Sequence, residues 1–300
     1  MFQVRAYALL FVWVASSTLL CALTAGNFLS LLANSLNDTF GSIFPAIPFA
    51  ALLTVIFALR WPDLRGILER EARLSSDLTL RLTGVAVVEG LVLLRGYTGQ
   101  MVELSAVAIV ATFYATSLAL IPGAKRLVLP YALTYGAGVA APTILQWAFG
   151  EPLATVSTWM SSYVVSLTGI PITWQGMQFA VISKTGDLVS ATVTPGCSSI
   201  ISITTFLGLL VLMHIDLRKD AKSTVELAVA GVVALTLLNS VRIAILIWVG
   251  YVNGAAAFWG IHNWVGYAIF IGFYLVAIFT YSRMRGGPKA GLPSGTVLGS

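Results

Sequence analysis

The run VELAVAGVVALTLLNSVRIAILIWV, from Val225 to Val249, holds one acidic and one basic residue in 25 positions. As a helix that rises 1.5 Å per residue, it is long enough to cross about 30 Å of hydrocarbon. Arg242 lies 17 steps into this run, or about 25 Å along the helix. An arginine in hydrocarbon costs about 2.5 to 3.5 kcal/mol on insertion scales, so it should face protein or water and have a partner or a function. The alternative is a side chain that reaches out to the outer lipid headgroups.

The composition of the whole chain extends this interpretation. Of its 300 residues, 58% are hydrophobic and only 10% are charged. The protein cannot bury that much apolar surface within itself, so the lipid bilayer must cover it. A net charge of +5 would suggest nucleic acid in a soluble domain, but here the basic residues lie in short loops between apolar runs. We therefore expect a multispan membrane protein without a nucleic-acid partner.

Eight apolar stretches are long enough, or nearly so, to span a bilayer. They cover residues 6–23, 43–59, 82–94, 102–121, 127–149, 197–213, 225–249 and 261–281. The first resembles a signal peptide, but no small-residue cleavage site follows it, so we expect it to persist as a span. The expected fold is an all-α polytopic membrane protein with about eight transmembrane helices.

The basic residues also predict the orientation of these spans. Most of the 17 lysines and arginines fall in alternate loops, which share one side of the membrane. Because cytoplasmic loops carry an excess of Lys and Arg, both termini are expected in the cytoplasm. An outer belt of tryptophans then agrees with this orientation. It comprises Trp147, Trp159, Trp174, Trp248, Trp259 and Trp264.

One long segment, residues 150–196, is expected outside the membrane. Residues 152–167 repeat apolar side chains at helical spacing, which predicts a helix in the outer interface. Residues 170–193 alternate apolar and polar side chains around two turn signals, which predicts a small extracytoplasmic β-hairpin or sheet. This cap either shields the loops or offers a strand edge to a substrate peptide. The expected parts are N-terminal spans (1–149), the cap (150–196), C-terminal spans (197–282) and a cytoplasmic tail (283–300).

Three reactive side chains should meet at the outer membrane level. Cys197 follows a Pro-Gly break and begins an inward span, Arg242 lies near the outer end of an outward span, and His262 opens the last inward span. We expect Cys197 in the first helical turn, where free N–H groups and the helix dipole favour a thiolate. Arg242 would stabilise negative charge, and His262 can exchange a proton near neutral pH. The alternative for Cys197 is a structural cysteine packed among hydroxyl groups.

Three polar residues are expected to support this catalytic set. Asn239 lies three residues before Arg242 on the same helix face, where it can orient the guanidinium. Ser198 and Asn263 directly follow the cysteine and the histidine. The two cysteines of the chain lie far apart and have neither disulfide nor metal-ligand spacing. The chemistry expected of Cys197, Arg242 and His262 requires neither a metal nor an organic cofactor, so we expect none.

Four other residues are not assigned a catalytic role. Cys21 lies within an apolar run, which favours a structural role. His214 should lie at the cytoplasmic end of its span, away from Cys197. Glu89 and Arg95 occur in and after the third apolar stretch, where they could pair with each other or face a polar cleft.

The runs GIPITWQG, TPGCSSI, NSVRI and IHNWVG together resemble the exosortase/archaeosortase family, whose members are polytopic membrane enzymes. Members carry an ACSG-like motif at the start of a span, then Asn-x-x-Arg, then His followed four residues later by Gly. The matching positions here are Cys197, Asn239 with Arg242, and His262 with Gly266. The resemblance covers about residues 160–282. Ser199 stands where the family commonly has Gly, and its side chain could narrow the approach to the nucleophile.

The resemblance implies a sortase-like cysteine transpeptidase or endopeptidase at the outer face of a prokaryotic cytoplasmic membrane. Its partners would be the lipid bilayer and exported proteins with a C-terminal tail. Such a tail has a short motif, Pro-Glu-Pro in the best-known branch, then a hydrophobic span and a basic end. Cys197 would form a thioester with the cleaved protein and pass it to an acceptor. Two other functions stay open, namely a polytopic transporter and a catalytically inactive assembly factor.

Overall fold

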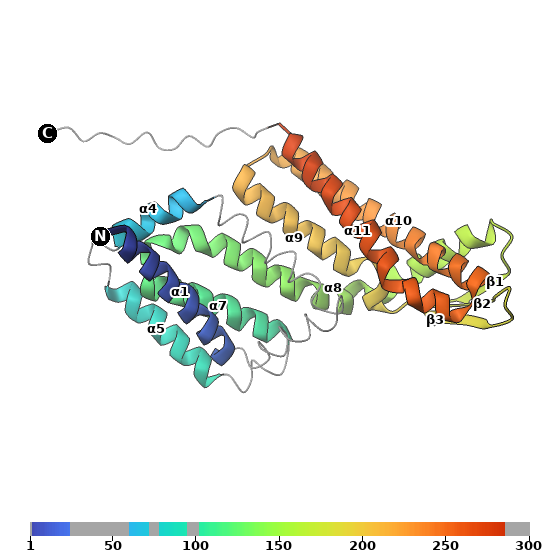
Figure 1. Ribbon diagram of the computed structural model, residues 1–300, viewed down its shortest axis with the longest axis horizontal. Helices are drawn as coiled ribbons and strands as arrows, with labels where there is room; N and C mark the ends of the chain where they lie inside the picture. Colours follow the sequence, from blue (N-terminus) through green and yellow to red (C-terminus); the bar gives the residue numbers. More distant parts are fainter. Residues whose placement is uncertain (1, 25–59, 72–77, 95–101, 286–300) are drawn as a thin grey trace.

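The computed structural model describes residues 2–24, 60–71, 78–94 and 102–285 (Figure 1). Helices dominate this part of the chain, and one small sheet accompanies them. The helices are α1 (Phe2–Thr24), α4 (Trp61–Glu71), α5 (Leu78–Leu93), α7 (Val102–Leu120), α8 (Lys125–Ser166), α9 (Ile200–Leu217), α10 (Ala221–Asn253) and α11 (Ala255–Arg283). Two 3-10 turns, η1 (Pro122–Ala124) and η2 (Pro195–Cys197), precede α8 and α9.

The helices form two groups that α8 connects. Helices α1, α4, α5 and α7 lie together on one side, and α9, α10 and α11 lie on the other (Figure 1). The first group packs around Trp13, Leu68 and Val128. The second packs around Phe206, Leu235 and other apolar side chains of α9, α10 and α11. Because α8 contacts α7 as well as α9 and α10, it couples the two groups.

Three described helices are long and apolar enough to cross a membrane, namely α9, α10 and α11. The two halves of α8 qualify as one further span if they are taken together. Helices α1 and α7 contain shorter apolar segments, Ala8–Cys21 and Val107–Leu120. The described residues thus do not confirm the expectation of about eight spans. The expected span at 43–59 lies outside them.

The expectation of a separate interfacial helix is wrong, because this segment is the second half of the continuous helix α8. It continues from the expected span through residues 152–166 and bends by 43° between Leu127–Pro142 and Ile144–Ser166. Proline in a helix interior removes one hydrogen bond and kinks the axis, which accounts for the bend at Pro142. In the second half the hydroxyl side is buried and the apolar side is exposed. The Thr158 and Ser161 hydroxyls donate to carbonyls one turn back, so these two can pack in an apolar protein interior.

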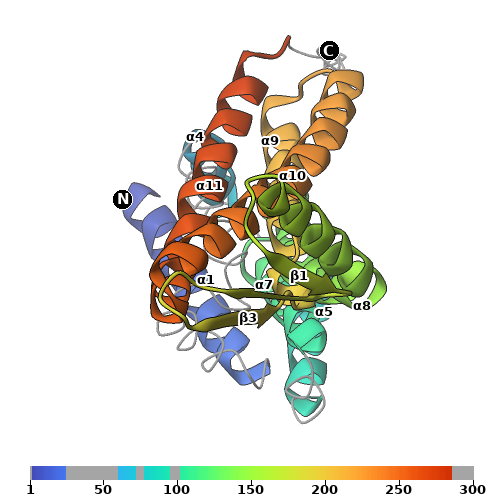
Figure 2. The same cartoon turned by 90° about the vertical axis from the view of Figure 1, so that its right-hand side faces the viewer.

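The predicted small sheet is present, with three antiparallel strands in the order β1 (Ile172–Gln175), β2 (Gln178–Ile182) and β3 (Leu188–Thr192). It lies across the ends of α8 and α11 (Figure 2). Side chains of a strand alternate between the two faces of a sheet. One face buries Phe179, Val181 and Val189 in a core that it shares with α8, α10 and α11. The Phe179 and Phe258 rings lie 6.0 Å apart across this contact.

The turn between β2 and β3 is attached to the loop between α10 and α11. The N–H of Lys184 donates to the Tyr251 carbonyl at 2.8 Å. Gly254 ends α10 with φ of 86°, a left-handed conformation that favours glycine. A Cβ there would also lie 3.0 Å from Thr185 Oγ1. The sheet is therefore fixed to the ends of the helices that carry Arg242 and His262.

Candidate active site

Cys197 lies in the 3-10 turn η2, directly after the chain leaves the sheet. Its N–H donates to the Thr194 carbonyl at 2.8 Å, and helix α9 begins only at Ile200. The expectation that Cys197 occupies the first turn of the helix is therefore wrong. The physical reason is that Ser198 is extended, with ψ of 169°, so the chain straightens once more before the helix starts. Cys197 itself is half-buried.

Neighbouring residues hold this turn in place. Ser198 is buried and donates its hydroxyl to the Pro195 carbonyl at 2.6 Å. Pro195 packs on Gly150 of α8, where a Cβ would approach the proline Cβ to 2.6 Å. Ser199 is fully buried as the residue that precedes α9. The turn before the helix is thus packed against α8 and is not a free loop.

Arg242 and His262 lie in contact on the neighbouring helices α10 and α11. Arg242 Nη2 is 3.2 Å from His262 Nε2 and 3.4 Å from the His262 carbonyl oxygen. Because a guanidinium can only donate, Nε2 of the neutral imidazole is the acceptor and the ring proton sits on Nδ1. His262 also packs against Trp259, with ring centroids 5.6 Å apart. The pair joins a fixed positive charge to a group that can take up a proton.

Asn239 links this pair to the cysteine turn. Its side-chain amide donates to the Cys197 carbonyl at 3.2 Å and to Ser157 Oγ at 3.3 Å. Its carbonyl oxygen is 3.5 Å from Arg242 Nη1. Asn239 is fully buried, so these bonds replace water. Helical spacing predicts the contact with Arg242, whereas nothing in the sequence indicates Ser157 except the hydroxyl-rich run of α8.

A glycine lets the guanidinium lie against α11. A Cβ on Gly266 would lie 3.0 Å from Arg242 Nε and 3.4 Å from Cζ. Arg242 Nε and His262 Nδ1 are both buried and have no hydrogen-bond partner among the described residues. Arg242 forms no salt bridge in this part of the chain. The site therefore has hydrogen-bonding capacity and positive charge that its own side chains do not satisfy.

A small pocket of about 90 Å³ opens beside this arginine. Arg242 lines it together with two of the expected supporting residues, Ser198 and Asn263. Gly196, the residue before the cysteine, also lines it. Tyr267 is a further lining residue that the sequence analysis missed. It lies one helical turn after Asn263, so helical spacing alone would have placed it on the pocket side.

The other residues singled out in the sequence lie apart from this site. Cys21 is buried, with its thiol 3.8 Å from the Ile109 carbonyl. His214 Nδ1 is 3.0 Å from the Tyr281 hydroxyl near the opposite end of α9. Glu89 is exposed on α5, and Arg95 lies outside the described residues. In the described part of the chain, no group of three or more His, Cys, Asp or Glu side chains could hold a metal ion.

The comparisons with known proteins come from three searches. The model of the transmembrane exosortase family (Exosortase EpsH) matches residues 34–279. Searches of curated proteins and of solved structures gave no match. The matched range is most of the chain and includes Cys197, Arg242 and His262, so the family resemblance is confirmed. This protein belongs to the transmembrane exosortase family.

Proposed function

We propose that this protein is a membrane-embedded cysteine transpeptidase. It cleaves the C-terminal sorting tails of exported proteins at the outer face of the cytoplasmic membrane. The observation that carries the proposal is the 3.2 Å contact between Arg242 and His262, together with the Asn239 bond to the Cys197 carbonyl. These contacts tie a thiol-bearing turn, a fixed cation and an imidazole into one cluster.

The first chemical step forms a thioester. His262 Nε2 takes the thiol proton of Cys197, and the sulfur attacks the scissile peptide carbonyl. Arg242 turns its donors toward the oxygen on which negative charge develops. The carbon–nitrogen bond then breaks, and the imidazolium of His262 gives its proton to the departing amine. The exported protein stays attached to sulfur, and the membrane tail leaves.

The second step releases the protein from Cys197. An incoming amine attacks the thioester carbonyl, and His262 takes one of its protons. The carbon–sulfur bond breaks and the thiolate leaves. With water as the nucleophile the same step gives proteolysis. No step needs a group beyond these side chains and the two substrates.

The membrane sets the register of the substrate. The hydrophobic span of a sorting tail fits the bilayer beside α9, α10 and α11, the described helices that are long and apolar enough to cross it. Its scissile bond then meets Cys197 at the end of α9 that adjoins the sheet. We take both termini to be cytoplasmic, because the Lys and Arg distribution favours that orientation.

Mass spectrometry of the full-length enzyme tests this proposal. Incubation with a synthetic tail peptide should give an adduct on Cys197 with the mass of the N-terminal fragment. The adduct should be absent in Cys197→Ala and should form in Cys21→Ala, the matched control at a buried cysteine away from the site. Cleavage by Cys197→Ala would refute the scheme. Full complementation in cells by the same variant would instead identify a non-enzymatic assembly factor.

A further inference from the structure

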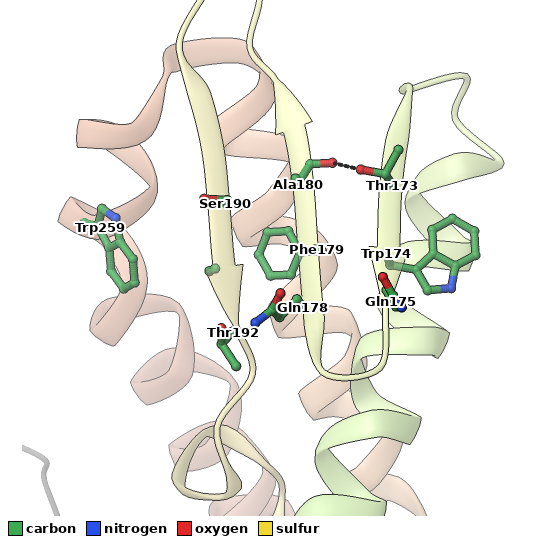
Figure 3. Close-up of a pocket in the computed structure, with 10 residues that line it drawn as sticks. Thr173, Trp174, Gln175, Gln178, Phe179, Ala180, Ser190, Thr192 and Trp259 are labelled. Atoms are coloured by element: carbon green, nitrogen blue, oxygen red, sulfur yellow. Dashed lines mark hydrogen bonds between the residues drawn. The ribbon is translucent and has the colours of Figure 1, made fainter.

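A groove of about 630 Å³ lies over the sheet, with Trp259 of α11 on one side and Trp174 of β1 on the other (Figure 3). All three strands line it. Its polar lining consists of two amides and three hydroxyls, and no lining residue is charged. The polar residues are Thr173, Gln175, Gln178, Ser190 and Thr192.

The strand register places these polar groups on one face. Gln178 of the central strand lies opposite Gln175 and Thr192, and residues directly opposite each other in a sheet share a face. A second row sets Thr173 and Ser190 on either side of Ala180. Within the sheet the main chains bond to one another, so a ligand on this face meets side chains. Amides and hydroxyls both donate and accept, which suits the N–H and C=O groups of another polypeptide.

The groove borders the catalytic cluster at two points. Thr192 ends β3, and the chain reaches Cys197 five residues later. Trp259 lines the groove, and its ring lies 5.6 Å from that of His262. A ligand in the groove would therefore lie close to the reacting groups without occupying them.

The inference rests on the proposed function, which fixes the direction of the substrate. The tail enters the bilayer after the scissile bond, so the residues before that bond leave on the side of the sheet. The sheet lies at one end of α10 and α11 (Figures 1 and 2). We propose that the groove binds this preceding segment of the exported protein and selects uncharged side chains there. A lysine or glutamate in the groove would lose water without gaining a counter-ion, because its lining is neutral.

Peptide binding to full-length Cys197→Ala in lipid nanodiscs tests this inference. The variant lacks the thiol that would cleave the peptide, so the peptide stays intact during the measurement. Three fluorescent tail peptides would share the motif Pro-Glu-Pro, a leucine-rich span and a Lys-Arg end. They would differ only in the four residues before the motif. In the neutral peptide these are Ser and Thr, in the lysine peptide two of them are Lys, and in the glutamate peptide two of them are Glu. We expect the neutral peptide to bind at least tenfold more tightly than either charged peptide.

A negative charge placed in the groove should separate the two charged peptides. With Gln178→Glu added to Cys197→Ala, the protein should bind the lysine peptide at least fivefold more tightly and the glutamate peptide more weakly, and misfolding does not produce such opposite changes. Trp259→Ala, combined with Cys197→Ala, should weaken binding of the neutral peptide at least fivefold. Trp248→Ala is the matched control, because Trp248 is 53% exposed, like Trp259 at 59%, but does not line the groove.

The outcomes separate this inference from the proposed function. Equal binding of the three peptides, unchanged by Gln178→Glu, would overturn the inference alone. Displacement of the neutral peptide by maltopentaose would assign the groove to a saccharide and would also overturn it. If no tail peptide binds to Cys197→Ala, the proposed function fails as well.

Discussion

Substitution of Gly266 by alanine should disable the site while it leaves the helix intact. The new Cβ would lie 3.0 Å from Arg242 Nε, where ordinary contacts lie at 3.4 Å or more. The guanidinium must therefore move away from α11 by about 0.4 Å. His262 lies on the same helix one turn earlier, so this shift also increases its distance from Arg242.

The effect on catalysis follows from that distance. Arg242 Nη2 and His262 Nε2 are 3.2 Å apart, and a shift of about 0.4 Å along the line that joins them lengthens this contact to about 3.6 Å, beyond hydrogen-bond range. The same shift moves the donors of Arg242 away from the oxygen on which negative charge develops, and a hydrogen bond to a charged group contributes about 1.5 to 3 kcal/mol. Loss of that amount in the transition state lowers kcat/KM roughly 10- to 150-fold. Helix stability should not fall, because alanine is a better helix former than glycine by about 1 kcal/mol.

Cleavage of a fluorogenic tail peptide by purified enzyme in nanodiscs measures kcat/KM, and differential scanning fluorimetry measures stability. Gly260→Ala and Gly272→Ala are matched controls on α11, since a Cβ at either position meets nothing within 4 Å. Both should retain wild-type activity. The reasoning is refuted if Gly266→Ala keeps its activity within twofold, or if the controls lose as much.

Three further changes test other contacts. Asn239→Ala should lower kcat/KM about tenfold and reduce thermal stability, because it leaves the half-buried Cys197 carbonyl without its donor. Gly231→Ala should destabilise the protein by about 1 to 3 kcal/mol, since its Cβ would clash with the Phe206 ring, and added Phe206→Leu should restore part of the loss. Hydrogen bonds from Ser223 at the start of α10 lower the pKa of the Asp220 carboxyl from its ordinary value. The stabilising effect of this carboxylate is therefore present above the pKa of the unfolded chain and is lost as the pH falls through the lower pKa of the folded chain. The melting-temperature difference between the wild type and Asp220→Ala should shrink on acidification.

The sequence predicts the C-terminal helices well because hydropathy decides them. Long apolar runs fit only a bilayer or a helical core, and α9, α10 and α11 form at the expected places. Alternation likewise predicts the sheet. The continuity of α8 past residue 149 is not predictable in this way, because the Gly150–Pro152 run reads as a helix break. Burial of the hydroxyl side keeps the helix intact, and only the tertiary structure shows which side is buried.

The candidate site shows a similar limit. The contact of Asn239 with Arg242 follows from helical spacing, and the placement of His262 follows from topology. The position of Cys197 before the helix does not, because a Pro-Gly break marks a turn but not its length. Packing of Pro195 on Gly150, distant in sequence, holds the observed turn. Contacts between distant residues of this kind leave no local pattern.

The bond between Lys184 and Tyr251 has a consequence for how such enzymes diversify. Because the β2–β3 turn packs around Gly254, the sheet cannot be exchanged independently of the loop between α10 and α11. A chimera that exchanges the strands alone would bring a mismatched turn against the helical hairpin. A graft of the cap from another family member would therefore have to include the residues that correspond to 251–254.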